Sequence, residues 1–177
     1  MKTIITPVDI VFDIEADGLF NEATTVWCIV AKDLETKEVR RFGPDNLPGA
    51  IAYLETATSL IGHNIVEYDL PMLRKFCSFI PSPETAIIDT LVMSRVLWPD
   101  RPLPQNIIGG EKYAGMFAPH SLEAWGWRFN RKKPKHEDWS KFSLDMLHRC
   151  SEDVEINVLT LEYLLRAEAN LQLGEIL

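Results

Sequence analysis

The sequence predicts a single α/β domain, and three observations lead to that class. The chain has 177 residues, of which 46% are hydrophobic, so it can bury one sizeable core without disulfides. Its first third contains short stretches rich in β-branched and apolar residues, separated by turn residues, a pattern typical of a strand meander. Its last third has apolar residues at helical spacing, which indicates a long helix with one buried face.

The first two thirds of the chain are expected to alternate strands and helices. Strands are predicted over three stretches of mixed β-branched, apolar and charged residues: 8–14, 24–32 and 38–42. The turn pairs Asp17-Gly18 and Gly43-Pro44 punctuate them. A helix is then predicted at 47–57, followed by a short buried strand that ends in a polar loop at 59–64. Two further helices are predicted at 70–79 and 90–97.

The last third of the chain is expected to hold an insertion and two more helices. Residues 98–119 are rich in Pro, Gly and polar residues, and an unstructured stretch of this length usually serves a site or moves. Ser121 and Ser143 are plausible N-caps of a short helix and of a long helix that ends near Leu171. The long helix has a predicted buried stripe of Leu144, Leu147, Val154, Val158, Leu161 and Leu165.

Composition excludes several classes of protein. A net charge of −8 argues against strong nonspecific adhesion to duplex nucleic acid, which depends on many contacts from Lys and Arg to phosphates. The three cysteines show no C-x-x-C spacing, so neither a zinc site nor a secreted disulfide framework is indicated, and a reducing cytoplasm fits best. Without a signal peptide or a membrane-spanning apolar run, the protein is expected to be soluble.

Carboxylates provide the strongest functional signal. Asp13 and Glu15 lie two apart on a predicted strand, so their side chains leave the same face and can bind a common cation. Asp69 opens a predicted helix, and Asp153 lies within the long one. Brought together, these four groups would supply the oxygen ligands that two hard divalent cations need. The sequence therefore suggests a metal-dependent site that cleaves phosphodiesters.

Each carboxylate also has an ordinary explanation when taken alone. Asp13 and Glu15 would then lie at a strand end that frays into solvent, and Asp69 would only cap its helix or interact with the helix dipole. Asp145, Arg149 and Asp153 follow one another at four-residue spacing, as in a solvated ladder of ion pairs. The combination is therefore more informative than any single member.

Three motifs resemble those of the DnaQ-like, or DEDD, 3′-to-5′ exonucleases. They are Asp-x-Glu-x-x-Gly-Leu from Asp13, His-Asn-x-x-x-Tyr-Asp from His63 to Asp69, and a late His-x-x-x-x-Asp that ends at Asp153. Residues 88–95 and 120–126 further resemble the proofreading domain of phage family A DNA polymerases. The resemblance covers nearly the whole chain, so residues 1–177 are expected to form one exonuclease domain.

The resemblance implies a fold and a set of metal ligands. The implied fold is ribonuclease H-like, with a mixed central β-sheet flanked by helices. The implied cofactors are two Mg²⁺ or Mn²⁺ ions, bound by Asp13, Glu15, Asp69 and Asp153. In that mechanism one ion activates the attacking water and the other stabilises the leaving 3′ oxygen.

The third motif departs from the phage polymerase pattern. Those domains usually have Tyr four residues before the last Asp, whereas this chain has Arg149 there. The histidine (DEDDh) subfamily has His five residues before that Asp, which is the position of His148. Histidine readily exchanges protons near neutral pH, so His148 is expected to be the general base.

Substrate contacts are inferred from the resemblance and from a basic segment. By resemblance, the Ala16 backbone meets the terminal nucleotide, Leu19 wedges beside its base and Asn64 positions the strand, although Leu19 could equally be a core or turn residue. The basic residues of the segment are Arg128, Arg131, Lys132, Lys133 and Lys135, with Trp139 following. Such a run is usually a solvated loop, but here it could grip the strand backbone while the aromatic stacks.

These observations together suggest a stand-alone 3′-to-5′ exonuclease that acts on single-stranded or frayed DNA and releases nucleoside 5′-monophosphates. Its expected partners are DNA 3′ ends and, for proofreading, a polymerase in trans. End trimming and nucleic-acid degradation during phage growth are the alternative roles. An RNA exonuclease of the same superfamily is an alternative, because no feature visibly reads a 2′-hydroxyl. A noncatalytic nucleic-acid-binding or polymerase-accessory module is another, and Arg149 in the tyrosine position favours it.

Overall fold

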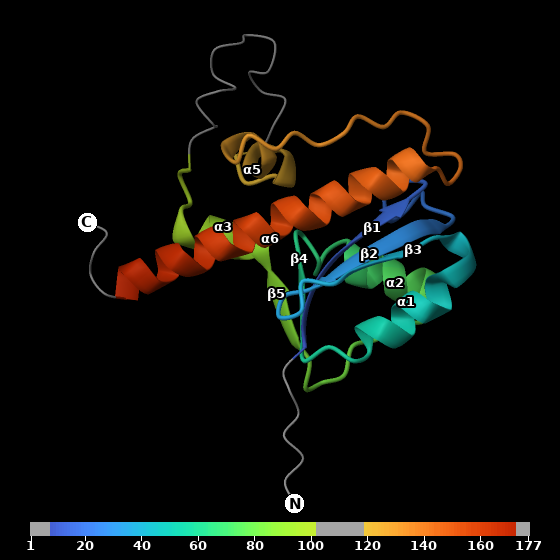
Figure 1. Ribbon diagram of the computed structural model, residues 1–177, viewed down its shortest axis with the longest axis horizontal. Coiled ribbons are helices and arrows are strands. Elements are labelled where there is room, and N and C mark those ends of the chain that lie inside the picture. The colour runs from blue at the N-terminus through green and yellow to red at the C-terminus, as the bar shows by residue number, and fades with distance from the viewer. Residues whose placement is uncertain (1–7, 102–118, 173–177) are drawn as a thin grey trace, which may run out of the picture.

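The computed structural model describes residues 8–101 and 119–172, which form a mixed sheet between two layers of helices (Figure 1). The described strands, in the sheet order β3-β2-β1-β4-β5, are β3 (Val39–Phe42), β2 (Val26–Asp33), β1 (Asp9–Ala16), β4 (Ser59–Gly62) and β5 (Ala86–Asp89). The β3-β2-β1 part is antiparallel, whereas β1, β4 and β5 run parallel to one another. The expected mixed sheet is confirmed, and β1 lies at its centre.

Helices cover both faces of this sheet. The described helices are the 3-10 turn η1 (Pro44–Asn46), α1 (Leu47–Leu54), α2 (Asp69–Cys77), α3 (Thr90–Leu97), α5 (Leu122–Arg128) and α6 (Leu144–Gln172). Apolar residues of α1 and α2 share a core with the β1 residues Ile10, Phe12 and Ile14. On the opposite face α6 packs over β1 and β2, while α3 and α5 pack against α6. Because side chains alternate along a strand, β1 contributes to both cores.

Helix α6 buries the middle of the predicted apolar stripe but not its two ends. Its residues in the core over β1 and β2 are Met146, Cys150, Val154, Val158 and Leu161. Leu144 and Leu165, predicted to be buried, are 77% and 49% exposed. Leu144 lies roughly 200° around the helix from Met146, and Leu164 rather than Leu165 is buried in the cluster that α6 forms with α5. The prediction was therefore wrong at both ends of the stripe.

Most predicted elements are present within a few residues of their expected bounds. Both predicted N-caps are confirmed, because Ser121 accepts a hydrogen bond from the Ala124 amide (3.2 Å) and Ser143 accepts one from the Met146 amide (3.1 Å). Strand β5 was not predicted. Most of the expected insertion, residues 102–118, lies outside the described residues. Within 8–101 and 119–172, no helix combines the length and apolarity that crossing a membrane requires.

Candidate metal centre

Strand β1 presents two carboxylates on the face that α6 covers. Asp13 and Glu15 alternate with Phe12 and Ile14, whose side chains enter the opposite core. The thiol of Cys150, on α6, lies 3.3 Å from the Asp13 carbonyl oxygen and 3.6 Å from its Oδ2. This places the Asp13 carboxylate directly beneath the helix.

Asp153 completes a tight group with these two side chains. One oxygen each from Asp13, Glu15 and Asp153 lies within 4.8 Å of the others. The approach follows from the packing of α6, because Cys150, three residues before Asp153, and Val154, directly after it, are buried against the sheet. The structure therefore brings together three of the four carboxylates that the sequence singled out.

Asp69 lies beside this group as the first residue of α2. Its side chain is buried, and the N-cap position before it is held by Tyr68, whose side chain makes no capping hydrogen bond. The preceding loop is held by Asp89, whose carboxylate accepts hydrogen bonds from the amides of Asn64 (3.0 Å) and Val66 (3.3 Å). Asn64 itself has a left-handed backbone, with φ of 68°. Asp89 was not identified from the sequence.

Burial and mutual repulsion raise the pKa values of all four carboxylates. Desolvation is the main cause of the raised pKa of Asp13, followed by the charges of Asp153, Asp69 and Glu15. Desolvation likewise raises the pKa of Glu15 to about 7, of Asp69 to about 7, and of Asp153 above its ordinary value. A group of this kind is costly to ionise unless a cation compensates it.

The donor set fits a hard divalent cation. Asp69 Oδ1 and Asp153 Oδ1 are buried and have no hydrogen-bond partner among the described residues, and Glu15 Oε1 has only an ion-pair contact with Arg149. Carboxylate oxygens are the ligands that Mg²⁺ and Mn²⁺ prefer. The residues present therefore satisfy the chemistry that a metal centre requires.

Two side-chain cations reach into the same group. Lys133 Nζ lies 2.6 Å from Asp153 Oδ2, and Arg149 Nε lies 3.3 Å from Glu15 Oε1. Arg149 Nη1 also donates a hydrogen bond to the Pro134 carbonyl (2.6 Å). Neither contact was predicted, because Lys133 was assigned to a strand-gripping segment and Arg149 to an ion-pair ladder along α6.

His148 is not brought to the carboxylates. It is exposed and lines a hollow of about 420 Å³ together with Arg41, Arg131, Ser151 and Glu152. Because α6 is continuous from Leu144, a residue five positions before Asp153 lies roughly 140° around the helix from it, whereas a residue four positions before shares its face. Arg149, not His148, therefore faces the carboxylates, and this placement argues against His148 as the base.

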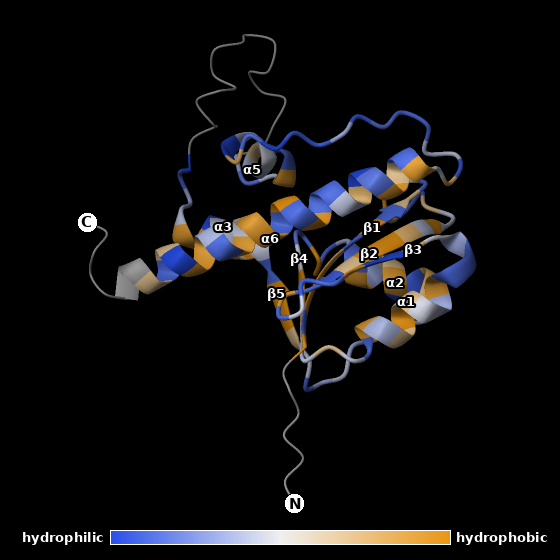
Figure 2. Cartoon of the chain, viewed as in Figure 1, coloured by the Kyte–Doolittle hydropathy of each residue, from blue (hydrophilic) through white to orange (hydrophobic). Residues whose placement is uncertain are grey.

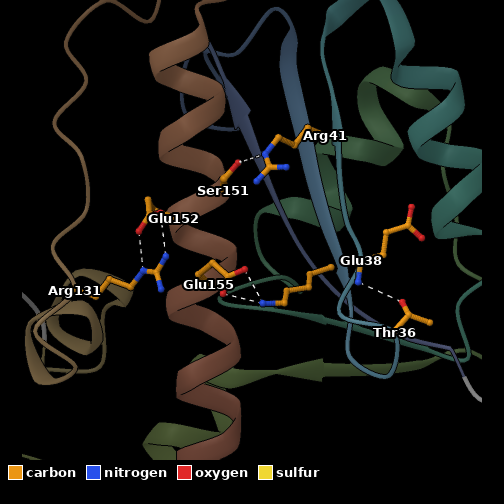
Figure 3. A network of polar contacts seen from close by, with 8 residues as sticks. Thr36, Glu38, Arg41, Arg131, Ser151, Glu152 and Glu155 are labelled. Atoms are coloured by element: carbon orange, nitrogen blue, oxygen red, sulfur yellow. Dashed lines mark hydrogen bonds and ion pairs between the residues drawn. The ribbon is translucent and has the colours of Figure 1, made fainter.

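The face of α6 that carries His148 makes polar contacts with neighbouring elements. Figure 3 shows Arg131 paired with Glu152, and Arg41 Nε donating to Ser151 Oγ at 3.0 Å. The network ties α6 to β3 and to the segment that precedes the helix. We infer a structural role for the hollow that contains His148.

A second hollow, of about 280 Å³, opens next to Glu15. It is lined by Glu15, Ala16, Asp17, Gly18, Leu19, Tyr68 and Trp139. Leu19 is 71% exposed, which excludes the core alternative and is compatible with a wedge. The Tyr68 hydroxyl donates to the Gly18 carbonyl (3.0 Å) and fixes the turn that carries Leu19. Asn64 is not among the lining residues.

Sequence comparison places this architecture among known proteins. No family model matches the chain. The chain is 28% identical over 185 residues to a DNA-directed DNA polymerase of Escherichia phage T7, an alignment that covers 88% of this chain and 26% of that polymerase. The chain thus spans about a quarter of the length of this relative.

Solved structures share the fold at low sequence identity. The Nibbler EXO domain of Aedes aegypti matches with a TM-score of 0.65 and 14% identity, over 96% of this chain and 83% of that chain. RNase D of Escherichia coli, an exoribonuclease involved in structured RNA processing, matches with a TM-score of 0.54 and 18% identity, over 96% of this chain and 42% of that chain. These matches establish the ribonuclease H-like exonuclease architecture.

Proposed function

We propose that this chain is a metal-dependent 3′-to-5′ exonuclease. It has the DnaQ-like 3′-to-5′ exonuclease fold and a distant similarity to phage T7 DNA polymerase. Its proposed substrate is single-stranded or frayed DNA, and its products are nucleoside 5′-monophosphates. The observation that carries the proposal is the group of three carboxylates whose oxygens lie within 4.8 Å. A phosphodiester can approach it from the adjoining hollow that exposes Leu19.

The residues that would hold Mg²⁺ or Mn²⁺ are Asp13, Glu15 and Asp153, with Asp69 beside them. Divalent cations at such a site polarise the scissile phosphate and lower the pKa of water. Arg149 is positioned to donate hydrogen bonds to a phosphate next to Glu15, but an always-protonated guanidinium cannot accept a proton. We therefore expect the proton of the attacking water to pass to solvent.

The hollow next to Glu15 suits the end of a strand. Leu19 and Trp139 provide apolar and aromatic surface for a terminal base, and Ala16 lines the same hollow. A terminus needs little unpairing when it is single-stranded or mismatched, so such ends should be the preferred substrates. We propose that this chain needs no second protein for hydrolysis, because all of the proposed ligands come from its own described residues.

DNA is the proposed substrate because the relative with detectable sequence similarity is a DNA polymerase. RNA remains the alternative, supported by the likeness to RNase D, which is a likeness of fold. Paired 5′-labelled DNA and RNA strands of the same sequence, incubated with Mg²⁺, Mn²⁺ or EDTA, distinguish the two. We expect a ladder of DNA products shortened from the 3′ end with either metal and no cleavage in EDTA. Cleavage of a circular single strand as fast as the linear one would exclude an exonuclease.

A noncatalytic nucleic-acid-binding module is the second candidate. The observation in its favour is that Lys133 and Arg149 already compensate two of the carboxylates. Such a module would shift a labelled single strand in a binding assay and leave it intact in Mn²⁺. The same incubations therefore separate a binding module from the exonuclease.

A further inference from the structure

We propose that Lys133 is a built-in counter-cation of this centre, which holds Asp153 in the metal-free protein and competes with the divalent ion for that carboxylate. The inference rests on the proposed metal site and assigns to Lys133 a role that its position in the sequence does not indicate. Lys133 would then set how tightly the site binds metal. It is a positioning residue, since it acts through Asp153.

The contact between the two side chains is close and nearly enclosed. Lys133 Nζ lies 2.6 Å from Asp153 Oδ2, and the two side chains are 13% and 4% exposed. Lysine and aspartate are rarely buried to this degree unless they are paired. The other oxygen of Asp153, Oδ1, is buried without a hydrogen-bond partner in the described part of the chain. The pair therefore compensates only part of the negative charge of the group.

Lys133 is brought to this position by the segment that connects α5 to α6, residues 129–143, which runs along α6 and is mostly hydrophilic (Figures 1 and 2). Two anchors flank Lys133. Arg131 donates two hydrogen bonds to Glu152, at 2.7 and 3.0 Å (Figure 3). The Pro134 carbonyl accepts one from Arg149 at 2.6 Å. With both neighbours fixed to α6, the Lys133 backbone is held above Asp153.

Competition follows from the size and charge of the ammonium group. It is a compact point charge on a flexible stem, and at 2.6 Å from Asp153 it lies where a cation shared by Asp153 and β1 would bind. Two cations a few ångströms apart repel strongly outside bulk water. Binding of a divalent ion therefore requires Lys133 to move away from Asp153.

Arg149 differs from Lys133 in this respect. Its guanidinium is hydrogen-bonded to the Pro134 carbonyl and lies 5.5 Å from the Trp139 ring centroid. These contacts do not depend on the carboxylates, so Arg149 can stay in place when the site binds metal. Lys133 is thus the cation whose removal should alter metal affinity most directly.

The test measures Mn²⁺ binding by isothermal titration calorimetry at pH 8 and thermal unfolding in EDTA, for the wild type, Lys133→Met and Lys135→Met. Lys135 is an exposed lysine of the same segment, so its replacement removes the same charge away from the group. We expect Lys133→Met to bind Mn²⁺ about tenfold more tightly or better and to melt below the wild type in EDTA. Lys135→Met should stay within about twofold of the wild type, as expected of an exposed charge.

The outcomes separate this inference from the metal site itself. If the wild type, Lys133→Met and Lys135→Met all bind Mn²⁺ with equal affinity, the role of Lys133 is overturned and the proposed metal site stands. Absence of Mn²⁺ binding in all three proteins would overturn both. If Lys133→Met does not fold, Lys133→Gln keeps a hydrogen-bond donor near Asp153 without the charge, and the same gain in affinity relative to Lys135→Met is expected.

Discussion

Replacing Asp13 by Asn should stabilise the metal-free protein while abolishing its activity. Burial, together with the charges of Asp153, Asp69 and Glu15, raises the pKa of Asp13 well above its ordinary value. The folded protein therefore binds a proton at Asp13 that the unfolded chain, with a pKa of about 3.9, releases at lower pH. A group with a raised carboxyl pKa makes the folded state lose stability as pH rises. Asn has nearly the same shape and does not ionise, so it removes this cost.

The size of the gain depends on pH. Between the unfolded and folded pKa values, the cost of keeping Asp13 protonated grows by about 1.4 kcal/mol per pH unit. The advantage of Asp13→Asn in free energy of unfolding should therefore grow as the pH rises above about 4, with a slope approaching that value while Asp13 stays protonated in the folded protein. Denaturation by urea in EDTA at several pH values measures it. Asp145→Asn, which changes an exposed aspartate of α6, is the control and should show almost no slope.

The effect of Mg²⁺ on the stability of these variants tests Asp13 as a metal ligand. Mg²⁺ should raise the stability of the wild type and of Asp145→Asn, but raise that of Asp13→Asn much less, since one ligand is missing. Exonuclease activity of Asp13→Asn should fall by about 100-fold or more, the scale expected when an electrostatic stabilising group is lost. If Asp13→Asn is less stable than the wild type at every pH, burial of Asp13 does not destabilise the metal-free protein. If it keeps full activity, Asp13 is not a ligand of the catalytic metal.

Three further predictions concern the rest of the site. The metal-free wild type should lose stability between about pH 4 and pH 7, because the pKa values of Glu15 and Asp69 are raised to about 7 in the folded protein. Urea titrations with saturating Mg²⁺ should show a smaller loss of stability over this pH range. Identical pH profiles with and without metal would contradict this prediction. His148→Ala should keep its kcat within a few-fold of the wild type, whereas Arg149→Ala should lose about tenfold or more, the scale of a lost charge-assisted hydrogen bond; the reverse order in single-turnover assays would restore His148 as the base. Leu19→Asp should raise KM for single-stranded DNA without altering the melting temperature, because Leu19 is 71% exposed; unchanged kinetics would remove the wedge role.

The carboxylates could be predicted from the sequence because local rules govern them. Asp13 and Glu15 share a face through strand alternation alone, and the motif resemblance added Asp69 and Asp153. The strand and helix pattern of the first hundred residues was likewise predictable from periodicity. Strand β5 was not, because its four residues, Ala86–Asp89, are mostly exposed or half-buried and show no alternation.

The contacts of the site that the sequence did not predict join residues whose proximity depends on how the connecting segments fold. The ion pair between Lys133 and Asp153 joins residues twenty positions apart, through a segment with no periodicity. The position of His148 on another face of α6 has a different origin, and its role as general base stays a prediction. A motif spacing of five residues puts histidine beside aspartate only if the chain departs from regular helix between them, whereas α6 is continuous from Leu144. Helical geometry then favours Arg149.

The proposed hydrolysis requires that the carboxylates of β1, α2 and α6 bind divalent cations. Anomalous diffraction at the manganese edge, from crystals grown with Mn²⁺ and a short thymidine oligonucleotide, tests it most directly. We expect manganese peaks within coordination distance of Asp13, Glu15 and Asp153, with the 3′ end of the strand beside Leu19 and Lys133 displaced from Asp153. Manganese bound elsewhere, or an intact ion pair between Lys133 and Asp153 in a metal-free centre, would contradict it.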